Sequence, residues 1–172
     1  MSLPRTCVFA LAAATALALS ACGFTPLYAA RGVSPSLAAI QVAAPQGRAG
    51  QLVRESLDDA LARDAARPAA YRMDLALTEQ RYPRGLRVDN VATRYEYVLV
   101  ASYTLVALPS GGAAKRGRVR VQVTYDSADQ PYASVAAQQD AQARAAAEAA
   151  RRIELELAVW MAGADRAAAG GS

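Results

Sequence analysis

The chain has 172 residues, with 19 Lys and Arg against 15 Asp and Glu, two Cys and no His. Without imidazole, histidine-dependent acid–base chemistry, histidine-assisted nucleophiles and most zinc sites are excluded. The length suits one domain with a modest hydrophobic core.

Residues 1–21 are typical of an export signal. Arg5 precedes an uncharged run of thirteen residues, 7–19, which is shorter than the roughly 20 residues that a membrane-spanning helix needs. The run leads into L-S-A-C, the lipobox of bacterial lipoproteins, and this predicts cleavage before Cys22 and acylation of its thiol and new amino group. The alternative is an ordinary secretory signal followed by an incidental cysteine.

Removal of the signal changes the cysteine count. Cys7 leaves with the signal and Cys22 becomes a thioether, so the mature chain can form no disulfide and depends on its core. Gly23 behind the anchor, in place of Asp, favours the outer membrane. Residues 22–36 contain two prolines and no periodicity, and we interpret them as the lipidated N-terminus and a tether.

The next segments alternate between strand and helix patterns. Residues 37–44 are a short strand candidate, and residues 51–64 carry apolar side chains at helical spacing. From Tyr71 the apolar period changes to two, with an interruption at Pro83 and Gly85. A long strand is predicted over about 88–108, and the Gly-rich turn 109–112 joins it to a further alternating run in an antiparallel hairpin.

A second helix is predicted over residues 132–162, with Ser134 as its N-cap and an alanine stripe on one face. Leu155 and Val159 fall on the opposite side of this helix and could mark a partner contact. We expect residues 164–172 to be a disordered tail. The sequence thus predicts a single domain over residues 37–163, an α+β two-layer sandwich with two helices packed on a four-stranded, mostly antiparallel sheet.

Positive charge is concentrated in the middle of the chain. Residues 81–120 carry eight basic and two acidic side chains, a net charge of +6. Because guanidinium groups suit phosphates, we interpret this segment as a binding site for an anionic lipid or glycolipid, with nucleic acid disfavoured in an exported protein. The candidate residues are Lys115, Arg116, Arg118 and Arg120 at the hairpin, with Arg84 and Arg87. The alternative is a solvated face whose charges protect a sheet edge.

Catalytic motifs are missing from the sequence. It contains no G-x-S-x-G, no S-x-x-K and no phosphate-binding loop. Asp58 and Asp59 lie on the polar side of the first predicted helix, where solvated carboxylates are the simpler interpretation. We therefore predict neither an active site nor a metal site.

Residues 22–28 read C-G-F-T-P-L-Y, and a lipobox cysteine followed at once by G-F-x-P-L-Y resembles the LPS-assembly lipoproteins of the LptE type. The predicted element order is similar to that family's two-layer fold. The resemblance implies a non-enzymatic protein of the outer membrane, lipid-anchored on the periplasmic side. It would plug the lumen of the large barrel LptD, assist the assembly of that barrel and bind lipopolysaccharide.

Only the lipidated Cys22 carries over from the family as a site residue. Its N-acyl chain (palmitate) and S-diacylglycerol would be the only covalent group, and no cofactor is expected. The implied partners are LptD, lipopolysaccharide and the inner leaflet of the outer membrane. Two other functions stay open at this point: an auxiliary lipoprotein of a phospholipid or ABC-type envelope transport complex, and a periplasmic enzyme of envelope metabolism.

Overall fold

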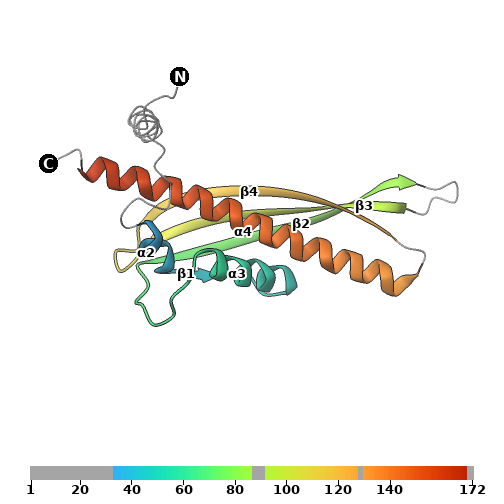
Figure 1. Cartoon of the computed structure of the whole chain (residues 1–172), viewed down its shortest axis with the longest axis horizontal. Helices are drawn as coiled ribbons and strands as arrows, with labels where there is room; N and C mark the ends of the chain where they lie inside the picture. Colours follow the sequence, from blue (N-terminus) through green and yellow to red (C-terminus); the bar gives the residue numbers. More distant parts are fainter. Residues whose placement is uncertain (1–32, 87–91, 128–129, 170–172) are drawn as a thin grey trace, which may run out of the picture.

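The computed structural model describes residues 33–86, 92–127 and 130–169. Cys22 and Arg87 lie outside this part of the chain. The described elements are listed here in chain order (Figure 1): α2 (Val33–Ala38), β1 (Ile40–Ala43), α3 (Arg48–Ala60), β2 (Tyr71–Leu86), β3 (Ala92–Ala107), β4 (Ala113–Asp126) and α4 (Pro131–Ala169).

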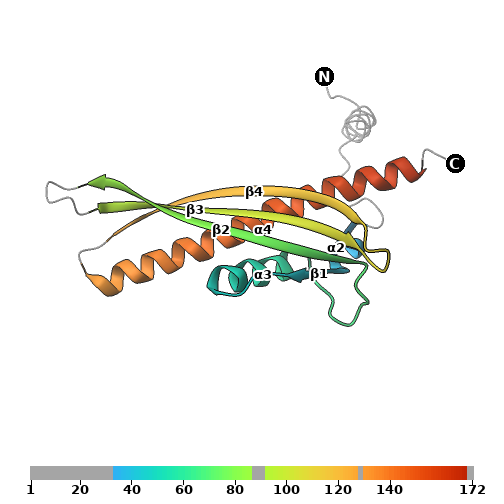
Figure 2. The ribbon, with the colours of Figure 1, turned by 180° about the vertical axis from the view of Figure 1, so that it is seen from behind.

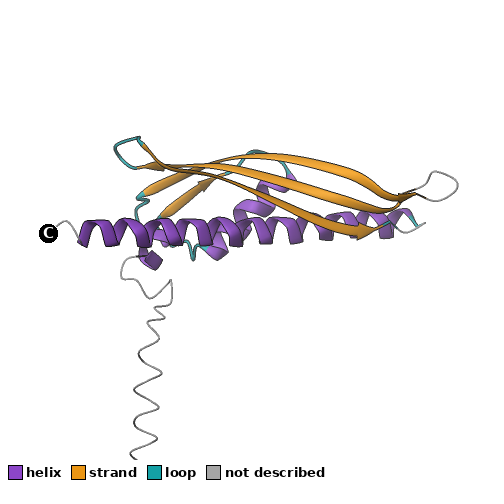
Figure 3. Ribbon diagram, turned by 90° about the horizontal axis from the view of Figure 1, so that it is seen from above, coloured by secondary structure: helices purple, strands orange, loops and turns teal. Residues whose placement is uncertain are grey.

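The four strands form one sheet in the order β1-β2-β3-β4. β1 runs parallel to β2, and the other two pairs are antiparallel. The helices lie on one side of the sheet and no element covers the other side within the described residues (Figures 2 and 3). The predicted α+β two-layer sandwich is confirmed, with the short helix α2 as an additional element.

Apolar side chains on one face of the strands build the core between sheet and helices. Met73, Leu99, Leu105 and Val121 are buried on the helix side. α4 faces them first with small residues and then with larger ones, listed here from the N-terminal end: Ala141, Ala145, Ala146, Ala149, Ala150, Ile153 and Leu157. Alanine leaves the helix backbone close to the strands, so a helix of 39 residues follows the sheet along most of its length (Figure 1).

Several predicted boundaries are wrong, for identifiable reasons. Residues 33–38 form a helix within the segment interpreted as a tether and the start of a strand, which leaves only Ile40–Ala43 as β1. β2 continues through Pro83 and Gly85 to Leu86. Beyond Asp74 it has no strand on its β1 side among the described residues, and an edge strand tolerates a proline because no neighbour needs its missing N–H.

The ends of α4 also differ from the prediction. The helix begins at Pro131, whose fixed φ suits a first helical position. Ser134 is therefore not the N-cap: its backbone N–H already donates to the carbonyl of Gln130 at 3.1 Å. At the other end α4 runs to Ala169 through residues expected to be disordered, because alanine has the highest helix propensity.

Candidate ligand-binding face

The side of the sheet remote from the helices, here called the open face, carries three rows of side chains. On β2 it presents Asp74, Ala76, Thr78, Gln80, Tyr82 and Arg84. Across the strands these residues are opposite Thr104, Ser102, Val100, Val98, Glu96 and Arg94 of β3. The third row is formed by Arg116, Arg118, Arg120, Gln122, Thr124 and Asp126 of β4. Lys115 is adjacent to Arg116 in the strand and pairs with Leu105, so its side chain lies on the helix side of the sheet. The predicted grouping of Lys115 with Arg116, Arg118 and Arg120 is therefore wrong.

The half of the open face nearest residues 84 and 94, the distal half, satisfies its own charges. Arg84 forms an ion pair with Glu96, with 2.6 Å between Nη2 and Oε2. Gln122 donates to the other oxygen of Glu96 at 2.7 Å. Arg94 and Asp126 pair at 2.8 Å. The sequence-predicted residue Arg84 therefore belongs to an internal network and has a carboxylate partner already.

The proximal half, from Asp74 to Arg120, is different. The guanidinium groups of Arg116, Arg118 and Arg120 form no ion pair or hydrogen bond with any side chain in the described part of the protein. They alternate along one strand, so neighbouring Cα atoms in the row are about 7 Å apart. Opposite them stand short, uncharged side chains of β3, namely Thr104, Ser102 and Val100. The result is three exposed positive charges beside a nearly neutral strip.

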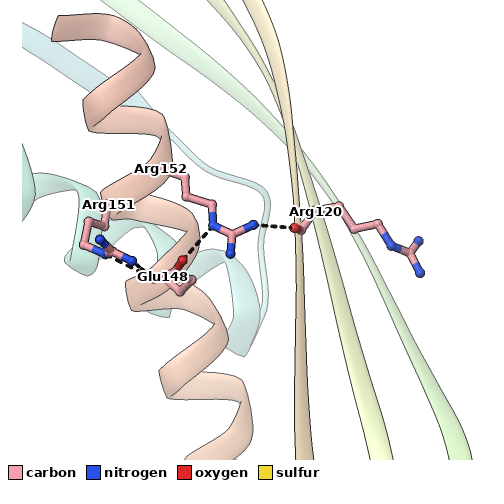
Figure 4. Close-up of polar contacts among 4 residues, drawn as sticks. All are labelled: Arg120, Glu148, Arg151 and Arg152. Carbon is pink, nitrogen blue, oxygen red and sulfur yellow. Dashed lines mark hydrogen bonds and ion pairs between the residues drawn. The ribbon is translucent and has the colours of Figure 1, made fainter.

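α4 holds the strand that carries this row. Arg152 of α4 donates through Nη1 to the backbone carbonyl of Arg120 at 3.1 Å. Its Nε donates to Glu148 at 2.6 Å. Hydrogen bonds from Arg151 and Arg152 lower the pKa of Glu148, which keeps this carboxylate charged. Figure 4 shows that the guanidinium of Arg120 extends from β4 away from α4, so the edge is fixed while the arginine side chain stays free.

A shallow depression lies in the proximal half of the open face. It has a volume of about 380 Å³ and mostly apolar walls. Its lining includes five residues of the open face, Asp74, Ala76, Ser102, Thr104 and Arg116, and three residues that alternate with them, Leu75, Tyr103 and Gly117. Asp74 is neutralised by a bidentate contact with Arg72, at 2.9 and 3.1 Å. Sequence reasoning missed this feature, although the small residues Ala76 and Ser102 within alternating strands were a visible signal.

Other kinds of site find little support. Among residues 33–86, 92–127 and 130–169, no group of His, Cys, Asp and Glu could hold a metal ion. No helix in this part of the chain is long and apolar enough to cross a membrane. The burial of Tyr97 and Tyr103 and their hydrogen bonds to Glu79 and Glu156 raise the pKa of both phenols well above the usual value. The Tyr97 hydroxyl links β3 to β2 through Glu79, and the Tyr103 hydroxyl links β3 to α4 through Glu156. These hydrogen bonds indicate a structural role for both tyrosines.

The described residues form a small α+β domain, and the sheet face remote from the helices carries a row of three unpaired arginines. The family model described as LptE, lipopolysaccharide-assembly, matches residues 37–157, and the chain belongs to this family. As a member of this family it is an envelope lipoprotein with a general role in lipopolysaccharide assembly.

Three solved structures of similar chains provide a comparison. The chain is 54% identical to a candidate lipoprotein from Caulobacter crescentus CB15, covering 77% of this chain and 96% of that one with a TM-score of 0.68. The rare lipoprotein B of Shewanella oneidensis is 14% identical, with 73% and 93% covered and a TM-score of 0.46. Lipoprotein B of Nitrosomonas europaea is 13% identical, with 67% and 81% covered and a TM-score of 0.47. None of the curated proteins matches the chain.

Proposed function

We propose that this protein is an outer-membrane lipoprotein that plugs the LptD barrel, helps that barrel to assemble, and binds lipopolysaccharide on its way to the outer leaflet. A lipid on Cys22 anchors it on the periplasmic side, and it acts without catalysis. The observation that carries the proposal is the row of Arg116, Arg118 and Arg120, which is unpaired on a sheet face whose distal half is fully paired, in a chain of the lipopolysaccharide-assembly family.

The row has the chemistry that an acidic glycolipid requires. Each guanidinium offers a planar fork of donors that matches phosphate or carboxylate oxygens. Three such groups in line can meet several acidic groups on one ligand, while the short side chains of β3 leave the approach open. Lys115, on the other side of the sheet, would not join them in one contact, and Arg84 would have to leave Glu96 first.

A partner surface is available on the opposite side of the molecule. Leu155 and Val159 are 51% and 53% exposed on α4, one helical turn apart. This agrees with the pattern in the sequence and leaves an apolar spot facing outward from the helix layer. A plug inside a barrel would use the helix side for the wall and keep the open face for the ligand.

Affinity capture from the native outer membrane tests the barrel part of the proposal. The mature lipoprotein, extracted in mild detergent, is expected to co-purify with one large β-barrel in equal amount. Recovery as a free monomer would refute the plug. Recovery with an inner-membrane transporter would favour the alternative of an auxiliary transport lipoprotein.

Charge reversal tests the ligand part. Changing Arg116, Arg118 and Arg120 together to Glu should weaken lipopolysaccharide binding at least tenfold while the circular dichroism spectrum is unchanged. A matched control replaces three exposed arginines elsewhere by Glu, Arg54, Arg67 and Arg144, so that the net charge is the same. Equal binding by both variants would return the row to the role of a solvated face.

A further inference from the structure

The geometry points to a second component of the binding face: we propose that the depression beside the arginine row holds a hydrocarbon chain of the same acidic ligand. This inference rests on the proposed function and names the part of the ligand that each half of the site takes. Acidic groups would lie along Arg116, Arg118 and Arg120, and one alkyl chain would lie across the sheet over Ser102 and Ala76.

The register places the two components side by side. Arg118, Ser102 and Ala76 are directly opposite one another on three adjacent strands. Adjacent strands lie about 4.8 Å apart, so a chain that leaves the arginine row crosses roughly 10 Å of sheet before it reaches the β2 side. The depression occupies this path, with Thr104 and Arg116 along one side. A head group at Arg118 would therefore deliver its chain directly into the hollow.

The walls have the chemistry of an alkyl subsite. They are mostly apolar, and the lining residues Ala76, Thr104 and Arg116 all carry methyl or methylene groups that an alkyl chain can contact. The one carboxylate in the lining, Asp74, is bound on both oxygens by Arg72 and so presents little net charge to a chain end. Apolar surface covered by a ligand is removed from water, and this gain does not depend on the head group.

A second hollow, of about 590 Å³, lies at the distal end of the strands, but it is lined by Arg84, Gly85, Thr93, Arg94 and Asp126 and its walls are more polar than apolar. In the distal half Val98 has no exposed surface, so that half presents no exposed valine of β3 to a ligand. The polar network of Arg84, Glu96 and Gln122 lies over that region. The hollow with mostly apolar walls and the unpaired arginines thus lie together in the proximal half. A ligand that complements both has an acidic head group and a hydrocarbon chain, so we infer an acidic amphiphile as the occupant.

Four small probes separate the two contributions. The mature chain with Cys22→Ser, which carries no lipid of its own, is titrated with inorganic phosphate, butyl phosphate, octyl phosphate and octyl glucoside, all below their micelle concentrations. Binding is followed by NMR of the backbone amides of Ala76, Ser102 and Gly117. We expect octyl phosphate to bind at least tenfold more tightly than butyl phosphate and to shift these three amides. Octyl glucoside should bind weakly.

Two variants locate the effect. Ala76→Trp fills the hollow and should reduce the advantage of octyl over butyl phosphate to less than about threefold, with inorganic phosphate bound as before. Thr124→Trp, on the same face but in the distal half, is the matched control and should keep the full advantage.

The outcomes distinguish this inference from the proposed function. If phosphate binds at the arginines but chain length makes no difference, the hydrocarbon subsite is refuted and the lipopolysaccharide proposal stands. If octyl glucoside binds as tightly as octyl phosphate, the coupling of chain and charge is refuted. If no phosphate probe binds at all, the arginine row fails as a ligand site and both proposals for the open face fall.

Discussion

Replacement of Gly117 by valine should unfold the junction between β4 and α4. Gly117 lies directly opposite Tyr103 in the sheet, and the tyrosine ring covers the glycine. A Cβ atom added at Gly117 would overlap with Cε1, Cζ and the hydroxyl oxygen of Tyr103, so the tyrosine side chain would have to move. Tyr103 is buried, and its hydroxyl donates to Glu156 of α4 at 2.8 Å. Valine would therefore displace both the ring and the hydrogen bond that joins sheet and helix.

The size of the effect follows from these two losses. Overpacking of a core costs about 1–3 kcal/mol, and loss of a hydrogen bond to a charged acceptor costs about 1.5–3 kcal/mol. The better strand propensity of valine returns up to about 1 kcal/mol. The net destabilisation at Gly117 is about 1.5–6 kcal/mol, and the middle of this range corresponds to a decrease in Tm of roughly 10 °C for a domain of this size.

Thermal and urea unfolding, followed by circular dichroism, measure the change. Gly112→Ala is the matched control, because the nearest atom to a Cβ there is Ser110 Oγ at 4.0 Å, and it should change the stability by less than about 0.5 kcal/mol. In the double variant Tyr103→Leu/Gly117→Val the clash is removed, so its cost should be smaller than the sum of the single costs. A Tm for Gly117→Val within 2 °C of the wild type, or strictly additive costs, would refute the reasoning.

Four further changes have expected signs. Gly163→Ala in α4, where an added Cβ meets no atom within 4 Å, should stabilise the protein by about 1 kcal/mol in urea unfolding, because glycine is a poor helix former. Burial raises the pKa of Asp58 above its usual 3.8, so ionisation of this carboxyl group destabilises the folded state once the pH exceeds 3.8. Asp58→Asn should therefore raise Tm at pH 7 and leave Tm unchanged at pH 3. The pKa values of Tyr97 and Tyr103 are raised in the folded state, so the folded state favours the protonated phenols and the free energy of unfolding decreases as pH rises above about 10. The double change to Phe should make this decrease at alkaline pH smaller, as measured by urea unfolding. Arg118→Gln relieves two repulsions of about 0.6 kcal/mol each across about 7 Å in water, and a gain in stability measured in 10 mM salt should disappear in 500 mM salt.

Most of the fold could be predicted from local patterns. The period of two from Tyr71 onward and the Gly-rich turn at 109–112 were enough to predict the antiparallel strands, because alternate residues of each strand face the helices. The alanine stripe predicted a helix packed closely on a sheet, and Ala146 and Ala150 are buried as expected. Ala136, in the same row, is exposed because the first turns of α4 pack little against the sheet.

The wrong boundaries of β2 and α4 share one cause, because each depends on structure that neighbours the segment. Pro83 interrupts an isolated strand pattern, but β3 pairs with β2 across it and the other side of β2 needs no donor at that point. Gly163 and the following small residues suggest a frayed tail, yet a helix already 30 residues long needs no new nucleation to continue through alanines. The propensities of the local residues predict neither outcome, since one depends on the strands beside Pro83 and the other on the helix that precedes Gly163.

The candidate site was predictable in position and unpredictable in detail. Charge counting located the basic segment, and alternation alone could have separated Lys115 from Arg116. The partners of the other arginines come from distant positions: Glu96 for Arg84, and Asp126 for Arg94. Only the strand register brings these charges together, so a sequence count treats paired and unpaired arginines alike.

The lack of ion pairs at Arg116, Arg118 and Arg120 is not explained by a lack of acidic side chains in the chain. Residues 121–172 contain seven carboxylates, and the open face itself presents Asp74, Glu96 and Asp126. Each of these three is already bound to another arginine, at 2.6–2.9 Å. A solvated face that only needed to stay soluble could alternate its signs across the strands, as the distal half does. Because the proximal half leaves three like charges together, at an energetic cost, beside a hollow with mostly apolar walls, the arrangement favours neutralisation by an acidic group from outside the chain.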